Sequence, residues 1–168
     1  MSKIRVLAVR QPWASLIVEG LKTIEIRSVN TNIRERIAIY ASLKKPTSEI
    51  LTCTFSTLGR WEHYKTLGDS DREKYEYLNS LNQNDYITGY IIGTVELTNS
   101  LQIKSCCGTS NCDWVWIYKN SYAHAEMIFN DNFLWRLENP VKFSQPIPYK
   151  PPKGAVVWSK TELLEGLI

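Results

Sequence analysis

The chain has 168 residues and a formal net charge of +3, with 43% apolar and 22% charged residues. This composition excludes disordered, collagen-like and low-complexity classes, and the length predicts a single domain over residues 1–168. The longest segments without a charged residue have ten residues, which is too short for a membrane-spanning helix. No apolar signal segment follows the N-terminus, so we expect a cytoplasmic protein that does not associate with membranes.

Hydrophobic patterning predicts six or seven short strands and a few helices in mixed order. The predicted strands are 4–9, 22–28, 36–42, 86–97, 113–119, 133–143 and 155–159. The predicted helices are 12–19, 45–66, 69–82 and 161–167, and the predicted loops are 98–112 and 144–154. Gly89, Gly93 and the pair Asn139-Pro140 predict bulges. Because strands do not alternate regularly with long helices, we expect an α+β fold: a compact β-barrel with helices on its rim.

The most informative segment is 10–27, with the sequence RQPWASLIVEGLKTIEIR. Pro12 suits the first turn of a helix, and Gly20 suits the left-handed residue that ends one. In the strand that follows, Glu25 and Arg27 point to the face opposite the isoleucines, and Lys22 sits at the strand entry. Charges on a strand usually face water and contribute little to stability. If this face lines a barrel mouth, its charges bind phosphate, carbonyl or base amino groups.

Charge is unevenly distributed along the chain. Residues 1–45 carry a net charge of +6 and residues 136–160 carry +4, whereas residues 60–96 carry −3. If the two ends of the chain meet, they form a basic face that attracts nucleic acid or another phosphate-bearing ligand; a solvated surface explains the same charges equally well. Aromatic residues are numerous. We expect Trp13, Trp116 and Trp135 in the core, and Trp158, beside a basic crossing, in a cleft wall.

The four cysteines are Cys53, Cys106, Cys107 and Cys112. Without a secretory signal, we expect reduced thiols rather than a disulfide framework. A zinc site would need His124 as the fourth ligand to the three clustered cysteines, and this spacing departs from the usual paired pattern. The sequence therefore predicts no metal and no cofactor.

The 10–27 segment resembles the signature of the ASCH domain family, a Gln-Pro-Trp-Ala helix start followed by Gly-x-Lys-x-x-Glu-x-Arg. The matching residues are Gln11, Pro12, Trp13, Ala14, Gly20, Lys22, Glu25 and Arg27. Residues 89–97 and 135–158 resemble other family segments, whereas about 44–86 and 99–132 look like variable insertions. The resemblance implies a PUA-like mixed β-barrel with peripheral helices. It also implies a cleft beside the helix, where the family is taken to bind RNA or other nucleic acid.

We therefore expect a single-stranded RNA or nucleotide-like ligand in this cleft. Lys22 and Arg27 would contact phosphate or base acceptors, and Glu25 would orient Lys22 or accept a hydrogen bond from a base. The remaining walls of the cleft would come from Arg10, Gln11, Trp13 and Trp158.

Two alternatives remain open at this point. One branch of the family hydrolyses N4-acetylcytidine with a lysine, a threonine and a distant glutamate. Lys22 matches that lysine, but Glu25 stands where the threonine would be. As an amidohydrolase, the protein would use Lys22 as the base and Glu25 as the other acid–base group. As a protein-interaction module, it would bind a partner through the aromatic loop Cys106–Tyr122.

Overall fold

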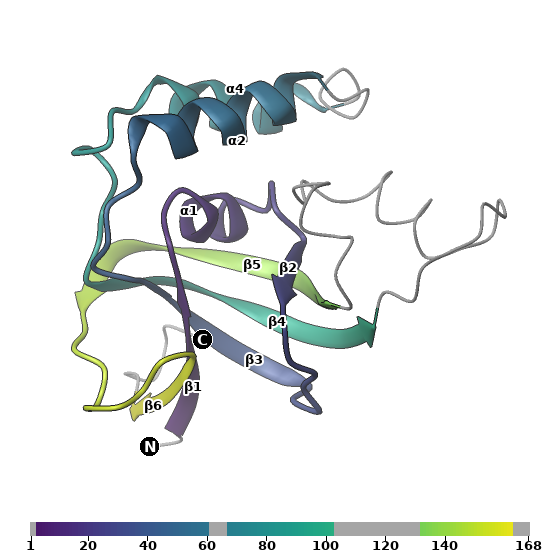
Figure 1. Ribbon diagram of the computed structural model, residues 1–168, viewed down its shortest axis with the longest axis vertical. Coiled ribbons are helices and arrows are strands. Elements are labelled where there is room, and N and C mark those ends of the chain that lie inside the picture. The colour runs from purple at the N-terminus through teal and green to yellow at the C-terminus, as the bar shows by residue number, and fades with distance from the viewer. Residues whose placement is uncertain (1–2, 61–66, 103–131, 163–168) are drawn as a thin grey trace, which may run out of the picture.

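The chain folds as a six-stranded mixed sheet with helices on one face, as the computed structural model in Figure 1 shows. The structure describes residues 3–60, 67–102 and 132–162. Its elements are β1 (Lys3–Val9), α1 (Trp13–Val18), β2 (Ile24–Arg27), β3 (Glu35–Ala41), α2 (Ser48–Arg60), α4 (Asp69–Ser80), β4 (Tyr90–Gln102), β5 (Phe133–Pro148) and β6 (Trp158–Glu162). The expected α+β class is confirmed. Within these ranges, every helix is too short or too polar to cross a membrane.

The sheet is open, so the expected closed barrel is wrong for the described part of the chain. The strand order is β2-β5-β4-β3-β1-β6, with β2 and β6 at the two edges. Strands β1 and β3 are parallel, and the other neighbours are antiparallel. Across the open side, the Arg27 guanidinium of β2 donates to the Ala8 carbonyl oxygen of β1 at 2.8 Å. A side-chain hydrogen bond therefore joins the edge strand β2 to β1, and no backbone ladder pairs the edge strands β2 and β6 among the described residues.

Two of the predicted bulges are confirmed in the long strands. The register shifts between Ile91 and Gly93, and a Cβ atom at Gly93 would lie 2.4 Å from the Val141 carbonyl oxygen. The register shifts again opposite Asn139, which has a positive φ of 48°. Asparagine tolerates this left-handed backbone conformation better than most residues. Gly89, with φ of +84°, lies just before β4 and not within it.

Helix α1 forms the middle layer of the molecule. Its Ile17 and Val18 pack against buried side chains of the sheet, including Trp135. On its other side, Leu16 and the following Leu21 pack against the outer helices α2 and α4 through Phe55, Tyr75 and Leu78. Figure 1 shows α1 between the sheet and this helix pair. The predicted helix end is confirmed, because Gly20 has a left-handed φ of 81°.

Several predicted boundaries are wrong because partner strands extend the pairing. Residues 98–102, predicted as a loop, continue β4 and pair with the start of β5. Strand β5 itself continues to Pro148, into the predicted proline-rich crossing. The last strand is 158–162 rather than 155–159, because it pairs with β1 from Leu7 to Lys3. Thr161, the first residue of the helix predicted at 161–167, therefore belongs to a strand. The predicted strand at 113–119 lies outside the described residues.

Candidate functional site

Three predicted charged residues of the 10–27 segment, Lys22, Glu25 and Arg27, meet in one cluster. The Glu25 carboxylate on β2 lies between two cations: its Oε2 is 2.7 Å from Lys22 Nζ, and its Oε1 is 3.0 Å from an Arg27 guanidinium nitrogen. Lys22 also donates to the Ile24 carbonyl oxygen. The backbone N–H of Lys22 donates to the Leu16 carbonyl oxygen at 2.9 Å. This hydrogen bond fixes the turn between α1 and β2, in which Lys22 lies.

Burial makes this cluster different from a surface ion pair. Lys22 is 5% exposed and Glu25 is 8% exposed. Desolvation lowers the pKa of the Lys22 ammonium, while Glu25 opposes this shift by its charge and its hydrogen bond. The Arg27 charge lowers the same pKa further. The cluster is thus one coupled unit, in which Glu25 compensates two neighbouring positive charges.

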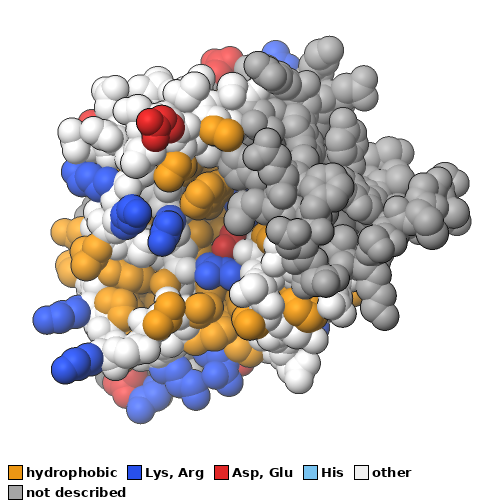
Figure 2. Space-filling view, viewed as in Figure 1, with side chains coloured by type: hydrophobic (Ala, Val, Ile, Leu, Met, Phe, Trp, Pro, Cys, Tyr) orange, Lys and Arg blue, Asp and Glu red, His pale blue; other side chains and the backbone are white. Residues whose placement is uncertain are grey.

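The cluster forms one wall of a cavity of about 520 Å³. Such a volume lies in the range of small-molecule sites. The described lining of the cavity contains four cationic residues, Arg10, Lys22, Arg27 and Lys44, and one carboxylate, that of Glu25. Figure 2 shows a hollow on this face where apolar, cationic and acidic side chains meet. The cavity therefore carries a net positive charge and suits an anionic or polar ligand.

Two polar atoms of residues in the cavity lining lack a hydrogen-bond partner. Arg27 Nε and Ser42 Oγ are buried, and neither has a hydrogen-bond partner among the described residues. Buried polar groups are normally satisfied, so unpaired ones in a cavity indicate a ligand or water that completes them. The Arg27 guanidinium also lies over the Trp135 ring, 5.9 Å from its centroid, which holds the side chain in place.

Five of the seven predicted binding residues line this cavity: Arg10, Trp13, Lys22, Glu25 and Arg27. Gln11 does not. It is 1% exposed, its Oε1 accepts from Ser15, and its Nε2 donates to the Ile87 carbonyl oxygen at 2.9 Å. Its amide thus anchors the start of α1.

Trp158 also lies outside the cavity lining. Its ring stacks on Trp135 with centroids 5.4 Å apart and an angle of 17° between the rings. Trp135 is buried in the core, as predicted, and its Nε1 donates to the Val29 carbonyl oxygen. Trp158 therefore supports the indole beneath Arg27, and it reaches the cluster only through that ring.

The sequence analysis missed seven lining residues: Ala8, Val9, Ile26, Ser42, Lys44, Val156 and Val157. The positive charge of residues 1–45 was the available signal for Lys44. No local signal marked Ser42, which reaches the site because its N–H donates to the Val9 carbonyl oxygen at the end of β1. Val156 is 83% exposed, so it forms an apolar rim.

The predictions for the cysteine loop and its aromatic residues fall on positions 103–131, outside the described residues. In the ranges that the structure describes, His, Cys, Asp and Glu side chains form no group of three or more that could hold a metal ion. Cys53, the described cysteine, is exposed and carries a free thiol.

Proteins similar to this chain include two curated relatives and crystal structures from one bacterium. Human activating signal cointegrator 1 is 29% identical and its mouse counterpart 32% identical, each over 144 residues. Each match covers 86% of this chain but only 20% of the relative, so the chain spans about a fifth of their length. The crystal structures, of ASCH from Zymomonas mobilis and of a point mutant, are 16% identical with TM-scores of 0.49. These matches cover 96% and 98% of this chain, and 87% and 92% of those chains.

A family model settles the relationship. The model described as the ASCH domain matches residues 7–123, which include the helix, the charged strand and β4. This match extends over more than half of the 168 residues. The chain therefore belongs to the ASCH domain family.

Proposed function

We propose that the cavity beside α1 binds a nucleotide of single-stranded RNA. The family is proposed to bind RNA, and the net positive cavity carries this proposal for the present chain. Four cationic residues and one carboxylate are among the described residues that line a space of about 520 Å³. Phosphate contacts from lysine and arginine supply most of the affinity for a nucleic acid.

The exposed cations at the cavity mouth would bind phosphate. Arg10 and Lys44 are both exposed and line the cavity. Because neither side chain is buried in the charged cluster, each is available to a phosphate oxygen. A strand passing over the mouth would release counterions from these positions, so its affinity would fall as salt rises.

The cavity interior would bind the base. The half-buried ring of Trp13 and the side chain of Val157 line it and offer apolar contact to a base. Glu25 accepts hydrogen bonds, whereas Arg27 Nε donates and Ser42 Oγ does both. RNA recognition of this kind uses unstacked bases whose edges are hydrogen-bonded by side chains. Lys22 would act mainly by holding Glu25, since its ammonium is already bonded to that carboxylate.

Salt-dependent binding of a short single-stranded RNA tests this proposal. Each phosphate contact contributes about −0.7 to the slope of log K against log salt for a single strand. Arg10→Ala and Lys44→Ala should each weaken binding and reduce the slope by about one contact. The matched control is Lys160→Ala, because Lys160 is exposed on β6 and does not line the cavity. An equal loss of RNA affinity in all three variants would indicate nonspecific binding to a basic surface and would refute the cavity as the binding site.

A second function has one observation in its favour. Lys22 is buried, its pKa is lowered by desolvation, and a carboxylate lies 2.7 Å away. Lowered lysine pKa values are typical of general bases. We propose as the alternative an amidohydrolase that acts on an acylated nucleoside such as N4-acetylcytidine, with Lys22 as base and Glu25 as the second acid–base group. Turnover of that nucleoside that is abolished by Lys22→Met would place this function first.

A further inference from the structure

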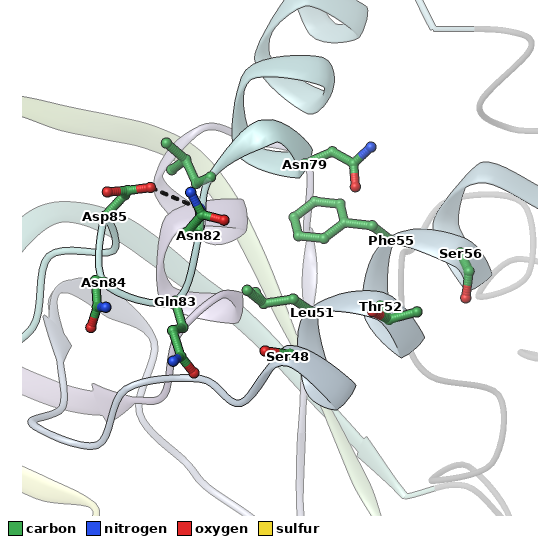
Figure 3. Close-up of a pocket in the computed structure, with 11 residues that line it drawn as sticks. Ser48, Leu51, Thr52, Phe55, Ser56, Asn79, Asn82, Gln83, Asn84 and Asp85 are labelled. Atoms are coloured by element: carbon green, nitrogen blue, oxygen red, sulfur yellow. Dashed lines mark hydrogen bonds between the residues drawn. The ribbon is translucent and has the colours of Figure 1, made fainter.

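A second groove lies away from the charged cluster, between α2 and the turn that follows α4. Its volume is about 820 Å³, and it shares no lining residue with the cavity described above. Figure 3 shows Asn82 and Gln83, from the turn, opposite Ser48 and Leu51 of α2. The groove is formed entirely by residues 48–85, within the segment that the sequence analysis separated from the family signature.

The lining of this groove is polar but almost uncharged. It contains four side-chain amides, those of Asn79, Asn82, Gln83 and Asn84. Facing them are hydroxyls at positions 48, 52 and 56, which recur every four residues and so share one face of α2. Among the residues that the structure describes, the lining contains no lysine or arginine. Its one carboxylate, Asp85, already accepts the Asn82 backbone N–H at 2.8 Å.

The amides are available for binding. The side chains of Asn79, Asn82 and Gln83 are exposed and make no hydrogen bond to another described residue. Each amide offers an N–H donor beside a carbonyl acceptor. Leu51 adds an apolar surface beside them. This combination suits a flat, uncharged group that carries adjacent donors and acceptors on its edge.

A short basic segment connects the groove to the charged cavity. Lys44 lines the cavity, and the ammonium of its neighbour Lys45 donates to Asn84 Oδ1 in the groove at 3.0 Å. Ser48, which lines the groove, is four residues beyond Lys44, a separation of at most about 14 Å along an extended chain. One lysine at the cavity and its neighbour at the groove therefore lie near each other, where both could contact phosphates of one bound strand.

We infer that this groove binds the base of a second, nearby nucleotide of the same RNA strand, and that it prefers adenine. The inference rests on the proposed function of the charged cavity. An asparagine or glutamine amide pairs with the N6 amino group and N7 of adenine in a bidentate contact. The N7 and O6 edge of guanine, with two acceptors, calls instead for arginine or lysine. Neither occurs among the described lining residues, and the ammonium of the adjacent Lys45 is bonded to Asn84. The cavity supplies general affinity, and the groove supplies the base preference.

Binding of oligoadenylate, oligouridylate and oligocytidylate of equal length to the full chain tests this inference. We expect oligoadenylate to bind most tightly, because the groove amides match its base edge. The double variant Asn82→Ala/Gln83→Ala should lower the oligoadenylate affinity at least about fivefold, the lower end for a bidentate base contact. The affinity of this double variant for oligouridylate should not change. The slope of log K against log salt should also not change, because the substitutions remove no phosphate contact. The matched control is Asn32→Ala/Gln145→Ala, at two exposed amides outside the groove.

The possible results separate the two proposals. If RNA binding depends on Arg10 and Lys44 but shows no base preference, or if the groove variant weakens all three oligomers equally, the groove inference is wrong and the cavity proposal stands. If no oligomer binds even at low salt, both are wrong. Side-chain amide NMR signals of Asn82 and Gln83 supply a direct reading. If these amide signals shift on addition of an uncharged extended peptide and not on addition of oligoadenylate, the groove binds protein and the inference is wrong.

Discussion

Replacing Glu25 with glutamine tests whether one buried carboxylate holds the charged cluster together. The substitution removes ion pairs of 2.7 Å to Lys22 and 3.0 Å to Arg27. Arg27 is 20% exposed at its side chain and keeps its bond to Ala8, but the Lys22 side chain is only 5% exposed. Breaking a buried pair leaves an uncompensated charge and costs about 3–5 kcal/mol, against about 0–1 kcal/mol for an exposed pair. We therefore expect Glu25→Gln to lower the free energy of unfolding by about 3–5 kcal/mol.

Urea denaturation of a double-mutant cycle measures this effect. The double variant Lys22→Met/Glu25→Gln should be more stable than Glu25→Gln alone, because it buries no unpaired lysine. Midpoints are comparable only where the m-value is unchanged. A loss below about 1 kcal/mol in Glu25→Gln, as for exposed pairs, would refute the argument that burial governs this cluster. So would strictly additive effects of the two substitutions.

Three further predictions concern stability and titration. Burial lowers the pKa of Lys22 in the folded protein below its value of about 10.4 in the unfolded chain. The free energy of unfolding should therefore rise with pH between these two pKa values. Denaturation at several pH values should show this rise in the unmodified protein and not in Lys22→Met. Gly93→Ala should cost at least about 1–3 kcal/mol in urea denaturation, whereas Gly68→Ala, with no atom within 4 Å, should change stability by less than about 1 kcal/mol. The Asn139 hydrogen bond lowers the pKa of Glu96, so Asn139→Ala should raise it in an NMR titration; an unchanged pKa would contradict this cause.

The 10–27 segment was predictable because its signals are local. Pro12 and Gly20 mark the two ends of a short helix by their backbone preferences. The alternation after Gly20 places Glu25 and Arg27 on one strand face whatever the partner strands are. Local rules therefore sufficed for the charged cluster.

Other features depend on contacts far along the chain, which local patterns do not encode. The end of β4 and the position of β6 follow from hydrogen bonds to partner strands. The role of Gln11 follows from a carbonyl 76 residues away, at Ile87. The contact between β2 and β1 follows from a hydrogen bond of Arg27 to the Ala8 carbonyl oxygen, 19 residues away. For β4, β6 and Gln11, the prediction was wrong because tertiary packing sets the partner of the residue or strand.

The ionisation of Lys22 distinguishes the two proposed functions by the sign of a pH effect. A binding cavity needs the lysine as ammonium, because the charge holds Glu25 and adds to the positive field over the site. Deprotonation removes that charge, so RNA affinity should fall as pH rises through the lowered pKa of Lys22. A general base must instead be neutral, so hydrolysis of N4-acetylcytidine should increase over the same interval. Fluorescence titrations and turnover assays across this range, with Lys22→Met as the pH-insensitive reference, measure both trends. RNA affinity that is unchanged across the transition in the unmodified protein would show that Lys22 does not contribute to binding through its charge.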